Sequence, residues 1–480
     1  MRRTKIVATI GPASESEAML RNLIRDGMNV ARLNFSHGTH TQHRRIIRRL
    51  RRLSREIGHP IAILQDLCGP KLRVGEIANP PMELQRGESV TLSARPARGG
   101  ASIPIAYPEL PRHLARGDRL LLDDGALQLR VEGSTETEIS ARVVIGGQLS
   151  SHKGINIPDV TLDIPAVTEK DVDDLGFGLD AGVDWVAMSF VRSPDDLKPL
   201  RDLMERRSRQ IPIIAKIEKH EAIRHLDDIV ASADGIMVAR GDLGVELPVD
   251  RVPTLQKDII QRCNKANKPV ITATQMLESM VHNSQPTRAE VSDVANAIWD
   301  GTDAVMLSGE TAVGRYPRAA VRMMATVAAR AENRIDFQRL SHERSALPAD
   351  SATEAIGQAV CVIAADLPVK AIITPTSSGT TPLLISMNRP RQPIIAPSAV
   401  EATRRRLPLL WGVHPVAVKP SRTIDDMIRR AMEAAILSGL VKRDDLVVVT
   451  GGLPGQPGLT NFVRIARVGE RISSMREARA

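Results

Sequence analysis

Eight short apolar segments rich in β-branched residues recur along the chain, and stretches of helical periodicity separate most of them. The segments are Lys5–Gly11, Asn29–Ser36, Ile61–Leu67, Val183–Val191, Pro212–Glu218, Gly235–Gly244, Pro269–Met276 and Asp303–Thr311. Helical periodicity is clearest in Ser14–Asp26, His40–Ile57, Val249–Ala266 and Thr287–Trp299. Apolar strands that alternate with amphipathic helices are typical of a parallel sheet with helices outside. Eight such units predict an α/β fold built on a (β/α)₈ TIM barrel.

A chain of 480 residues is too long for one ordinary domain, and two or three domains are expected. The alternation stops after Leu67 and resumes near Thr168. Short expected strands fill this interval: Met82–Leu84, Ser89–Leu92, Arg119–Leu122, Leu127–Val131 and Thr137–Val144. Closely spaced strands without helices predict a small β-barrel domain, inserted after the third barrel strand as a mobile lid.

A second alternation of helices and strands follows the polar stretch Ser341–Ala352. Its elements are Glu354–Ala365, Ala371–Pro375, Thr381–Asn388, Pro393–Ala396, Arg422–Ser438 and Leu446–Thr450. We therefore expect a TIM-barrel domain over 1–66 and 163–340, a lid domain over 67–162 and a C-terminal α/β domain over 341–480.

Composition narrows the possible partners. Only 2% of residues are aromatic, which argues against a base-stacking surface for single-stranded nucleic acid. The formal charge of +9 is densest in one expected helix, which carries Arg44, Arg45, Arg48, Arg49, Arg51, Arg52 and Arg55. A nucleic-acid patch is one interpretation of this helix. A solvated outer helix is the favoured one, because Ile46, Ile47, Leu50 and Leu53 supply a face toward the barrel. We expect no nucleic-acid partner.

The expected location is the cytoplasm. Cys68, Cys263 and Cys361 lie far apart without metal-ligand spacing, which suits a reducing compartment. No apolar run approaches the ~18–20 residues that span a bilayer. The segment Met1–Thr4 leads directly into an expected strand rather than into an apolar signal core. We expect no membrane partner.

Polar and charged residues stand where the barrel segments end: Asn34, Ser36, Asp66, Ser189, Lys216, Glu218, Asp242, Thr274 and Ser308. Because barrel enzymes carry their chemistry at the carboxyl ends of the strands, this pattern predicts an enzyme. Alternation along a strand places Lys216 and Glu218 on the same face, toward the barrel axis. Asp242 is expected to end the next strand, so Glu218 and Asp242 can converge on Mg²⁺ or Mn²⁺. A salt-bridged barrel rim is the alternative for either carboxylate alone, and the hydroxyls of Ser189, Thr274 and Ser308 are commonly structural at such positions.

Seven motifs resemble signatures of the pyruvate kinase family. They are Thr4–Ser14, Asn29–Gly38, Ile214–Glu221, Gly235–Pro248, Ala273–Met280, Pro286–Asn296 and Met306–Gly314. The resemblance implies phosphoryl transfer from phosphoenolpyruvate to ADP, giving pyruvate and ATP, in a homotetramer. Without a Gly-x-x-x-x-Gly-Lys-Ser/Thr loop or a Gly-x-Gly-x-x-Gly fingerprint, any nucleotide must be held by side chains and metal.

The resemblance also implies roles for individual residues. Lys216 would stabilise the transition state, and Glu218 and Asp242 would hold Mg²⁺. Arg32, Gly241, Asp242 and Thr274 would surround phosphoenolpyruvate, and Thr274 would deliver a proton to the enolate, through water shared with Ser308. The nucleotide would contact Asn34, Phe35, Ser36, His37, Arg73 and Lys153, and Asp124 would add a carboxylate on lid closure.

One motif departs from the family pattern. Many members hold K⁺ with groups that correspond to Asn34, Ser36, Asp66 and the residue at position 67, which is Leu67 here. The usual Glu of this motif is Lys71. An ammonium that pairs with Asp66 would supply the charge that K⁺ otherwise supplies, so we expect K⁺-independent activity. A solvated hinge lysine is the alternative.

The loop formed by Thr376, Ser377, Ser378, Gly379, Thr380 and Thr381 precedes an expected helix. Backbone N–H groups and hydroxyls at a helix start can bind phosphate, and family members bind activating phosphate esters at the corresponding loop. A simple helix cap is the alternative. With Gly451–Gly458 as a second wall, we expect a phosphorylated allosteric effector, with a sugar monophosphate or AMP favoured over fructose 1,6-bisphosphate.

Two other functions compete with this interpretation. A barrel lyase or aldolase that stabilises pyruvate enolate would need neither the lid nor the C-terminal domain. A catalytically silent paralogue would be expected to lose Lys216, Glu218 or Asp242, and all three are present.

Overall fold

The structure is a computed structural model that describes residues 2–94, 102–158, 160–162, 164–346, 348–452 and 459–470. Eight parallel strands close into a barrel. In chain order they are β1 (Lys5–Thr9), β2 (Val30–Asn34), β3 (Ala62–Asp66), β12 (Trp185–Met188), β13 (Ile213–Ile217), β14 (Gly235–Ala239), β15 (Val270–Ala273) and β16 (Ala304–Leu307). The (β/α)₈ barrel predicted from the sequence is therefore confirmed. Among the described residues, no helix is long and apolar enough to cross a membrane.

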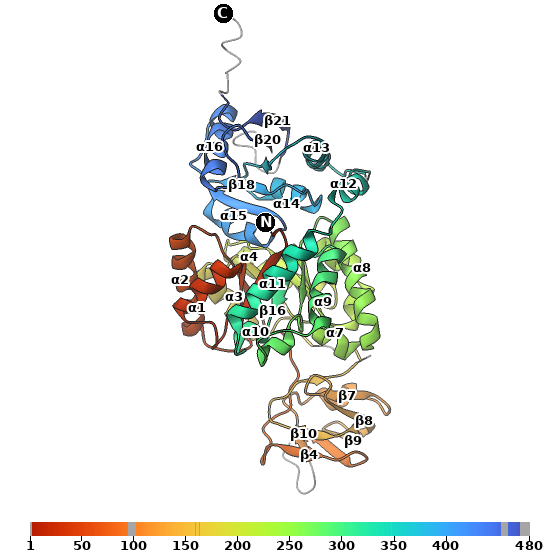
Figure 1. Cartoon of the computed structure of the whole chain (residues 1–480). Coiled ribbons are helices and arrows are strands. Elements are labelled where there is room, and N and C mark those ends of the chain that lie inside the picture. The colour runs from red at the N-terminus through yellow and green to blue at the C-terminus, as the bar shows by residue number, and fades with distance from the viewer. Residues whose placement is uncertain are drawn as a thin grey trace, which may run out of the picture.

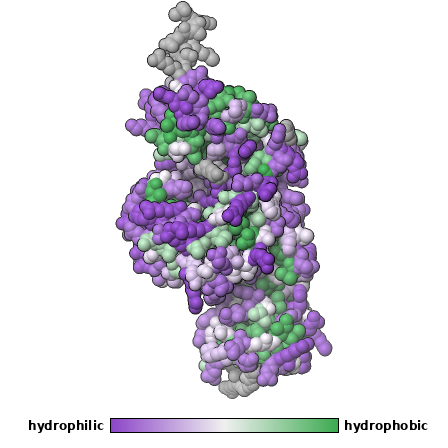
Figure 2. Space-filling view, viewed as in Figure 1, coloured by the Kyte–Doolittle hydropathy of each residue, from purple (hydrophilic) through white to green (hydrophobic). Residues whose placement is uncertain are grey.

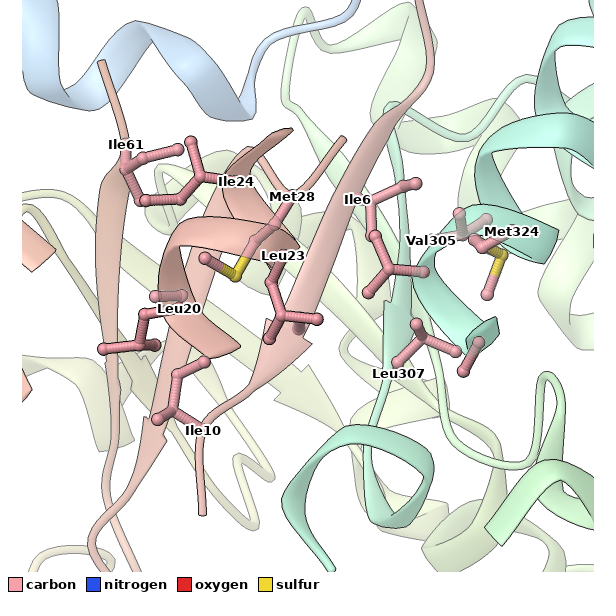
Figure 3. Packing of buried hydrophobic residues seen from close by; sticks show 14 of the residues in the cluster. Ile6, Ile10, Leu20, Leu23, Ile24, Met28, Ile61, Val305, Leu307 and Met324 are labelled. Carbon is pink, nitrogen blue, oxygen red and sulfur yellow. The ribbon is translucent and has the colours of Figure 1, made fainter. Parts of the chain in front are cut away.

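Successive residues along each barrel strand point alternately into the barrel and outward toward the helices. Val7 belongs to the cluster inside the barrel, whereas Ile6 and Ala8 pack outward against the helices. Figure 3 shows Ile6 among the buried side chains that fill the space between strands and outer helices. Those helices are α1 (Glu17–Asp26), α2 (His40–Ile57), α3 (Glu169–Ala181), α4 (Lys198–Arg206), α5 (His220–Arg224), α6 (Leu226–Ser232), α8 (Val252–Lys265), α9 (Arg288–Asp300) and α11 (Pro317–Glu332).

Side-chain caps fix where the principal helices begin. Thr39, Thr168 and Thr287 start α2, α3 and α9 with reciprocal capping boxes, and Ser16 caps α1. Each cap satisfies backbone N–H groups that have no partner inside the helix. The helices therefore start directly after the loops that carry the strand-end residues.

The domain inserted between β3 and α3, called the lid below, contains two sheets. The larger has six strands: β5 (Ser89–Ser93), β6 (Ser102–Pro104), β7 (Arg119–Leu122), β8 (Leu127–Ser134), β9 (Glu138–Ile145) and β11 (Ile155–Asn156). The smaller has two: β4 (Met82–Leu84) and β10 (Gly147–Leu149). Its edge strands are β11 and β6. The bridge of Arg73 to Gly154 adjoins β11, and the bridge of Val74 to Ile105 adjoins β6. These bridges connect the two edges in the manner of a small barrel.

The C-terminal domain has a five-stranded sheet in the order β19 (Val413–Ala417), β18 (Ile394–Ser398), β17 (Ala371–Ile373), β20 (Leu446–Gly451) and β21 (Phe462–Arg467). Its helices are α13 (Ala352–Asp366), α14 (Thr380–Met387), α15 (Glu401–Arg406) and α16 (Ile424–Leu437), and α12 (Phe337–Ser345) precedes them. The lid and this domain lie at opposite ends of the barrel (Figure 1).

The C-terminal domain closes the amino-terminal end of the barrel. Leu409 joins the cluster inside the barrel, and Lys5 donates a hydrogen bond to the carbonyl of Val413 (2.7 Å). A buried ion pair joins Arg389 to Asp303 (2.6 Å). The opposite end of the barrel, where the strands terminate on the side of the lid, is not covered by the C-terminal domain and is the expected location of an active site.

Candidate active site

Lys216 lies at the centre of this open end. It is the penultimate residue of β13 and has the same parity as Ile214, which faces the barrel interior. Its ammonium lies 2.8 Å from Glu218 Oε1 and 3.4 Å from Asp66 Oδ1, and donates a hydrogen bond to Ser189 Oγ (2.8 Å). Burial lowers the pKa of Lys216, but Asp66 and Glu218 outweigh it and raise this pKa above its usual value. The residue therefore stays a fixed positive charge.

Arg32 and Asp66 form the second part of the site. Arg32 Nε donates to Asp66 Oδ2 (2.6 Å), and Arg32 Nη1 donates to Thr9 Oγ1 (2.9 Å). Burial raises the pKa of Asp66, but Lys216 and Arg32 outweigh that effect and hold the pKa below its usual value. Asp66 is therefore an ionised carboxylate that orients two cations.

Glu218 and Asp242 bring two carboxylates to the rim. Glu218 directly follows β13, and its Oε2 accepts a hydrogen bond from the backbone N–H of Phe190 (2.8 Å). Burial raises the pKa of Glu218; Lys216 opposes this and the charge of Asp242 adds to it. A hard cation placed between the two carboxylates would relieve this repulsion. The oxygen donors thus fit Mg²⁺ or Mn²⁺.

The expectation that Asp242 ends a strand is wrong. β14 stops at Ala239, and Asp242 lies in the first turn of the short helix α7 (Arg240–Glu246). The apolar pattern continues through Leu243 and Val245, so the sequence alone does not separate the end of the strand from the helix that follows.

Thr274 and Gly241 are joined by a hydrogen bond. The N–H of Gly241 donates to Thr274 Oγ1 (2.8 Å), which itself donates to the carbonyl of Ala273 (2.7 Å). Thr274 and Gln275 have φ angles of 65° and 55°, an uncommon conformation outside glycine. Such outliers concentrate at functional sites. Among the described residues Ser308 Oγ is buried without a hydrogen-bond partner, which leaves it available to water or substrate.

Arg240 supports this turn, and sequence reasoning did not assign it a role. Its guanidinium donates to the carbonyls of Ala273 (3.1 Å) and Thr274 (2.6 Å) and pairs with Asp293 (2.6 Å). The only signal in the sequence was its position beside Gly241 and Asp242.

Lys219 is a second residue without an assigned role. Its ammonium lies 2.8 Å from Glu246 Oε1, which also accepts a hydrogen bond from Asn156 of lid strand β11 (3.2 Å). This contact connects the lid to helix α7, which carries Asp242.

The hinge residues have different partners from those expected. Lys71 Nζ lies 3.7 Å from Asp124 Oδ1 on the lid, whereas the cations beside Asp66 are Arg32 and Lys216. The expected pairing of Lys71 with Asp66 is therefore wrong for this structure. Asp66 is nearly inaccessible at 1% exposure, and Lys71 lies on the hinge outside it.

The groups expected to hold a monovalent cation are partly engaged. Leu67 is buried and its carbonyl accepts a hydrogen bond from Ser189 Oγ (2.8 Å). Asn34 Oδ1 accepts from the N–H of Ser36 (3.1 Å).

The residues expected at the nucleotide lie on both sides of the hinge. His37 is exposed and Ser36 half-buried, but Phe35 is buried and stacks on His43 with ring centroids 4.1 Å apart. The Phe35 side chain is therefore part of the core rather than of an open surface. On the lid, Lys153 pairs with Asp123 (2.8 Å) and Arg73 donates to the carbonyl of His152 (2.9 Å).

The Ser/Thr-rich segment Thr376–Thr381 leads from β17 into α14, as expected, and its last two residues begin that helix. Gly379 has a φ of 94° and its N–H donates to Thr376 Oγ1 (2.9 Å). Ser377 and Ser378 are exposed, and Ser378 Oγ lies 3.0 Å from Thr380 Oγ1. Thr381 Oγ1 is 2.7 Å from Thr460 Oγ1. Of the expected second wall, residues 453–458 lie outside the described part of the chain.

The family model for the pyruvate kinase barrel domain matches residues 1–321, and the model for the pyruvate kinase alpha/beta domain matches residues 354–466. The pyruvate kinase of Geobacillus stearothermophilus is 47% identical over 469 residues, which cover 97% of this chain and 80% of that relative. The pyruvate kinase of Staphylococcus haemolyticus (strain JCSC1435) is 45% identical over 478 residues, which cover 98% and 82% respectively.

A barrel that gathers a lysine, an arginine and three carboxylates at its open end belongs to an enzyme that acts on anionic substrates. With both family models matched over most of its length, the chain belongs to the pyruvate kinase family. It is accordingly a phosphotransferase.

Proposed function

We propose that this enzyme transfers the phosphoryl group of phosphoenolpyruvate to ADP with Mg²⁺, or Mn²⁺, as its divalent cation. The observation that carries the proposal is the buried ammonium of Lys216, held charged between Asp66 and Glu218 at the open end of the barrel. When the bond from phosphorus to the enol oxygen breaks, negative charge develops on that oxygen. A preorganised cation stabilises this charge more than it stabilises the substrate.

The proposed roles follow from position and chemistry. Arg32 binds the phosphate of phosphoenolpyruvate, because Asp66 and Thr9 hold its guanidinium beside Lys216. Thr274 stands with Gly241 at the substrate, and Ser308 has a free hydroxyl with which to share a water. Thr274 then supplies the proton that converts the enolate into pyruvate. Asn34, Ser36, His37, Arg73 and Lys153 contact the nucleotide as the lid closes and excludes water.

Glu218 and Asp242 are the proposed holders of the divalent cation. They supply two hard oxygen ligands, and a Mg²⁺ ion needs few protein ligands when water and substrate oxygens complete its coordination. When bound, the cation supplies positive charge to the phosphoryl oxygens.

We also propose that activity does not require K⁺. Lys71 places an ammonium group beside lid residue Asp124, at the position where many family members have a Glu. A K⁺ ion at about 4 Å from this ammonium would be opposed by about 4 kcal/mol at an effective dielectric near 20. Asp66 is already paired with Arg32 and Lys216. In this proposal Lys71 therefore acts on the lid side of the site.

The exposed residues Ser377 and Ser378, in the turn just before α14, support a proposed site for a phosphorylated effector. A sugar monophosphate or AMP is favoured, since no Lys or Arg occurs within Thr376–Thr381 for a second phosphate. A homotetramer in the cytoplasm completes the proposal. The three cysteines of each chain are unpaired, which suits a reducing compartment.

One assay tests these statements together. Pyruvate release is measured with and without ADP, Mg²⁺ and K⁺, and with a panel of phosphorylated metabolites. Release that depends on ADP and Mg²⁺ but not on K⁺ is the expected result. Release without ADP would favour the lyase alternative, and no release under any condition would favour the silent paralogue.

A further inference from the structure

The outer helix α2 concentrates most of the net charge of the chain. It carries seven arginines and one glutamate, which leaves a net charge of +6 against +9 for all 480 residues. Its apolar side chains, Ile46, Ile47, Leu50 and Leu53, are buried against the barrel. Packing therefore explains the inner face of the helix and leaves the arginines of the outer face unexplained.

Carboxylates neutralise only part of this outer face. Arg45 pairs with Glu15 (3.3 Å), and Arg52 pairs with Glu17 and lies 3.8 Å from Glu56. Within the described residues, Arg44 and Arg48 have no carboxylate partner. Since Arg44, Arg48 and Arg52 are spaced four residues apart, their charges repel one another along the helix. The arrangement opposes helix stability, and a bound anion would relieve it.

The arginines also border an open cleft on the surface of the helix. A cleft of about 580 Å³ is lined by Thr41, Arg44, Arg45, Arg48, Arg49 and Arg52. At 1.5 Å rise per residue, the row from Thr41 to Arg52 extends over about 16 Å. Figure 2 shows that the surface over α2, at the left edge of the view in Figure 1, is predominantly hydrophilic. A single phosphate would contact about one turn of this row, so only a long anion neutralises all of it.

The lining determines which long anion fits. The cleft offers guanidinium groups and one hydroxyl, and no aromatic ring from the described part of the chain lines it. The nearby ring of Phe177 is already covered by His40, stacked at 4.3 Å, and by the Arg44 guanidinium, 5.0 Å from its centroid. Among the described residues, nucleic-acid bases would thus find no free aromatic ring on which to stack. An anionic membrane would require exposed apolar side chains on this helix, and those are buried.

We propose that the arginine face of α2 binds inorganic polyphosphate, a linear chain of phosphates without bases. Guanidinium forks match phosphate oxygens, and successive helical turns present them to successive parts of the chain. This site lies on the outside of the barrel and is separate from the proposed phosphoryl-transfer chemistry.

The test measures binding of end-labelled long-chain polyphosphate by fluorescence anisotropy over a series of salt concentrations. Unlabelled orthophosphate, tripolyphosphate, and single-stranded RNA with the same number of phosphates serve as competitors. The double variant Arg44→Gln/Arg48→Gln is compared with Arg429→Gln/Arg430→Gln on α16, which removes the same charge elsewhere. We expect long-chain polyphosphate to bind best, and the α2 variant to weaken binding about tenfold or more, the size of one lost charge-assisted hydrogen bond. The salt slope should also fall by about one per arginine removed.

In the same α2 variant, kcat for pyruvate formation should stay at the wild-type value, which shows that the fold is retained. The proposal is overturned if RNA competes as well as polyphosphate of equal charge. It is equally overturned if the α16 variant loses as much affinity as the α2 variant, or if wild-type protein shows no binding at low salt.

Discussion

Replacement of Lys216 by methionine tests the central feature of the proposed site. Methionine keeps an unbranched side chain of similar length but removes the charge that lies 2.8 Å from Glu218 and 3.4 Å from Asp66. Loss of one preorganised donor of this type lowers kcat by about 10²–10³. Binding of phosphoenolpyruvate should change little, because Arg32 keeps its contacts with Asp66 and Thr9 and the charge of Lys216 matters most in the transition state.

The same change should destabilise the barrel, because Glu218 loses its only cationic partner among the described residues. Removal of one member of a buried ion pair costs about 3–5 kcal/mol. Mg²⁺ should therefore stabilise the variant more than it stabilises the wild type, since the cation would then be the only positive charge between Glu218 and Asp242.

Three measurements on Lys216→Met follow: kcat in a coupled pyruvate assay, phosphoenolpyruvate affinity by calorimetry, and urea unfolding with and without Mg²⁺. Lys216→Arg is the matched control, because it keeps the charge and should recover stability without recovering full activity. A methionine variant that retains more than about a tenth of wild-type kcat would refute the role of Lys216. So would a loss of rate at low phosphoenolpyruvate that disappears at saturating phosphoenolpyruvate, because the charge would then act only in substrate binding.

Three further predictions concern the metal, the lid and the effector loop. Glu218→Ala or Asp242→Ala should raise the Mg²⁺ concentration that gives half-maximal activity, and unchanged Mg²⁺ titrations would exclude these two ligands. Wild-type activity in a tetraalkylammonium buffer should nearly equal that in K⁺, whereas Lys71→Glu should respond to added K⁺; tenfold stimulation of the wild type by K⁺ would contradict this. Thr376→Asp with Ser378→Asp should abolish activation by the responsive phosphate ester and leave basal kcat intact, because carboxylates repel phosphate. Superimposable activation curves would place the effector elsewhere.

The barrel could be predicted because its signal is local. Each strand is a short apolar run, and residues two apart share a face. The proximity of Lys216 and Glu218 was therefore predicted from their spacing, although Glu218 directly follows β13. The end of the strand before Asp242 could not be found in this way. α7 begins with the polar segment Arg240–Asp242, but Leu243 and Val245 resume the apolar alternation beyond it, so the pattern does not mark the end of the strand.

Other parts of the site could not be predicted, because they depend on contacts between segments that are distant in the sequence. Arg240 clamps the turn at Thr274 through Asp293 and two backbone carbonyls, and no motif within its own segment records those partners. Phe35 stands inside a matching motif, yet its ring packs on His43 because α2 folds back over it. A motif thus fixes a position in the chain, whereas the packing of the following helix decides what the side chain contacts.

Lys71 shows the same limit between domains. From the sequence its natural partner was Asp66, only five positions away and a member of the same strand-end group. In the structure Asp66 is buried between Arg32 and Lys216, whose combined charge already holds its pKa low, so a third cation would add little there. Asp124 reaches Lys71 only because the lid returns to the hinge beside Gly154. If Lys71 replaces K⁺, it therefore does so by fixing the lid relative to the nucleotide rather than by neutralising Asp66. That is why the response of Lys71→Glu to K⁺ should be largest in the apparent affinity for ADP.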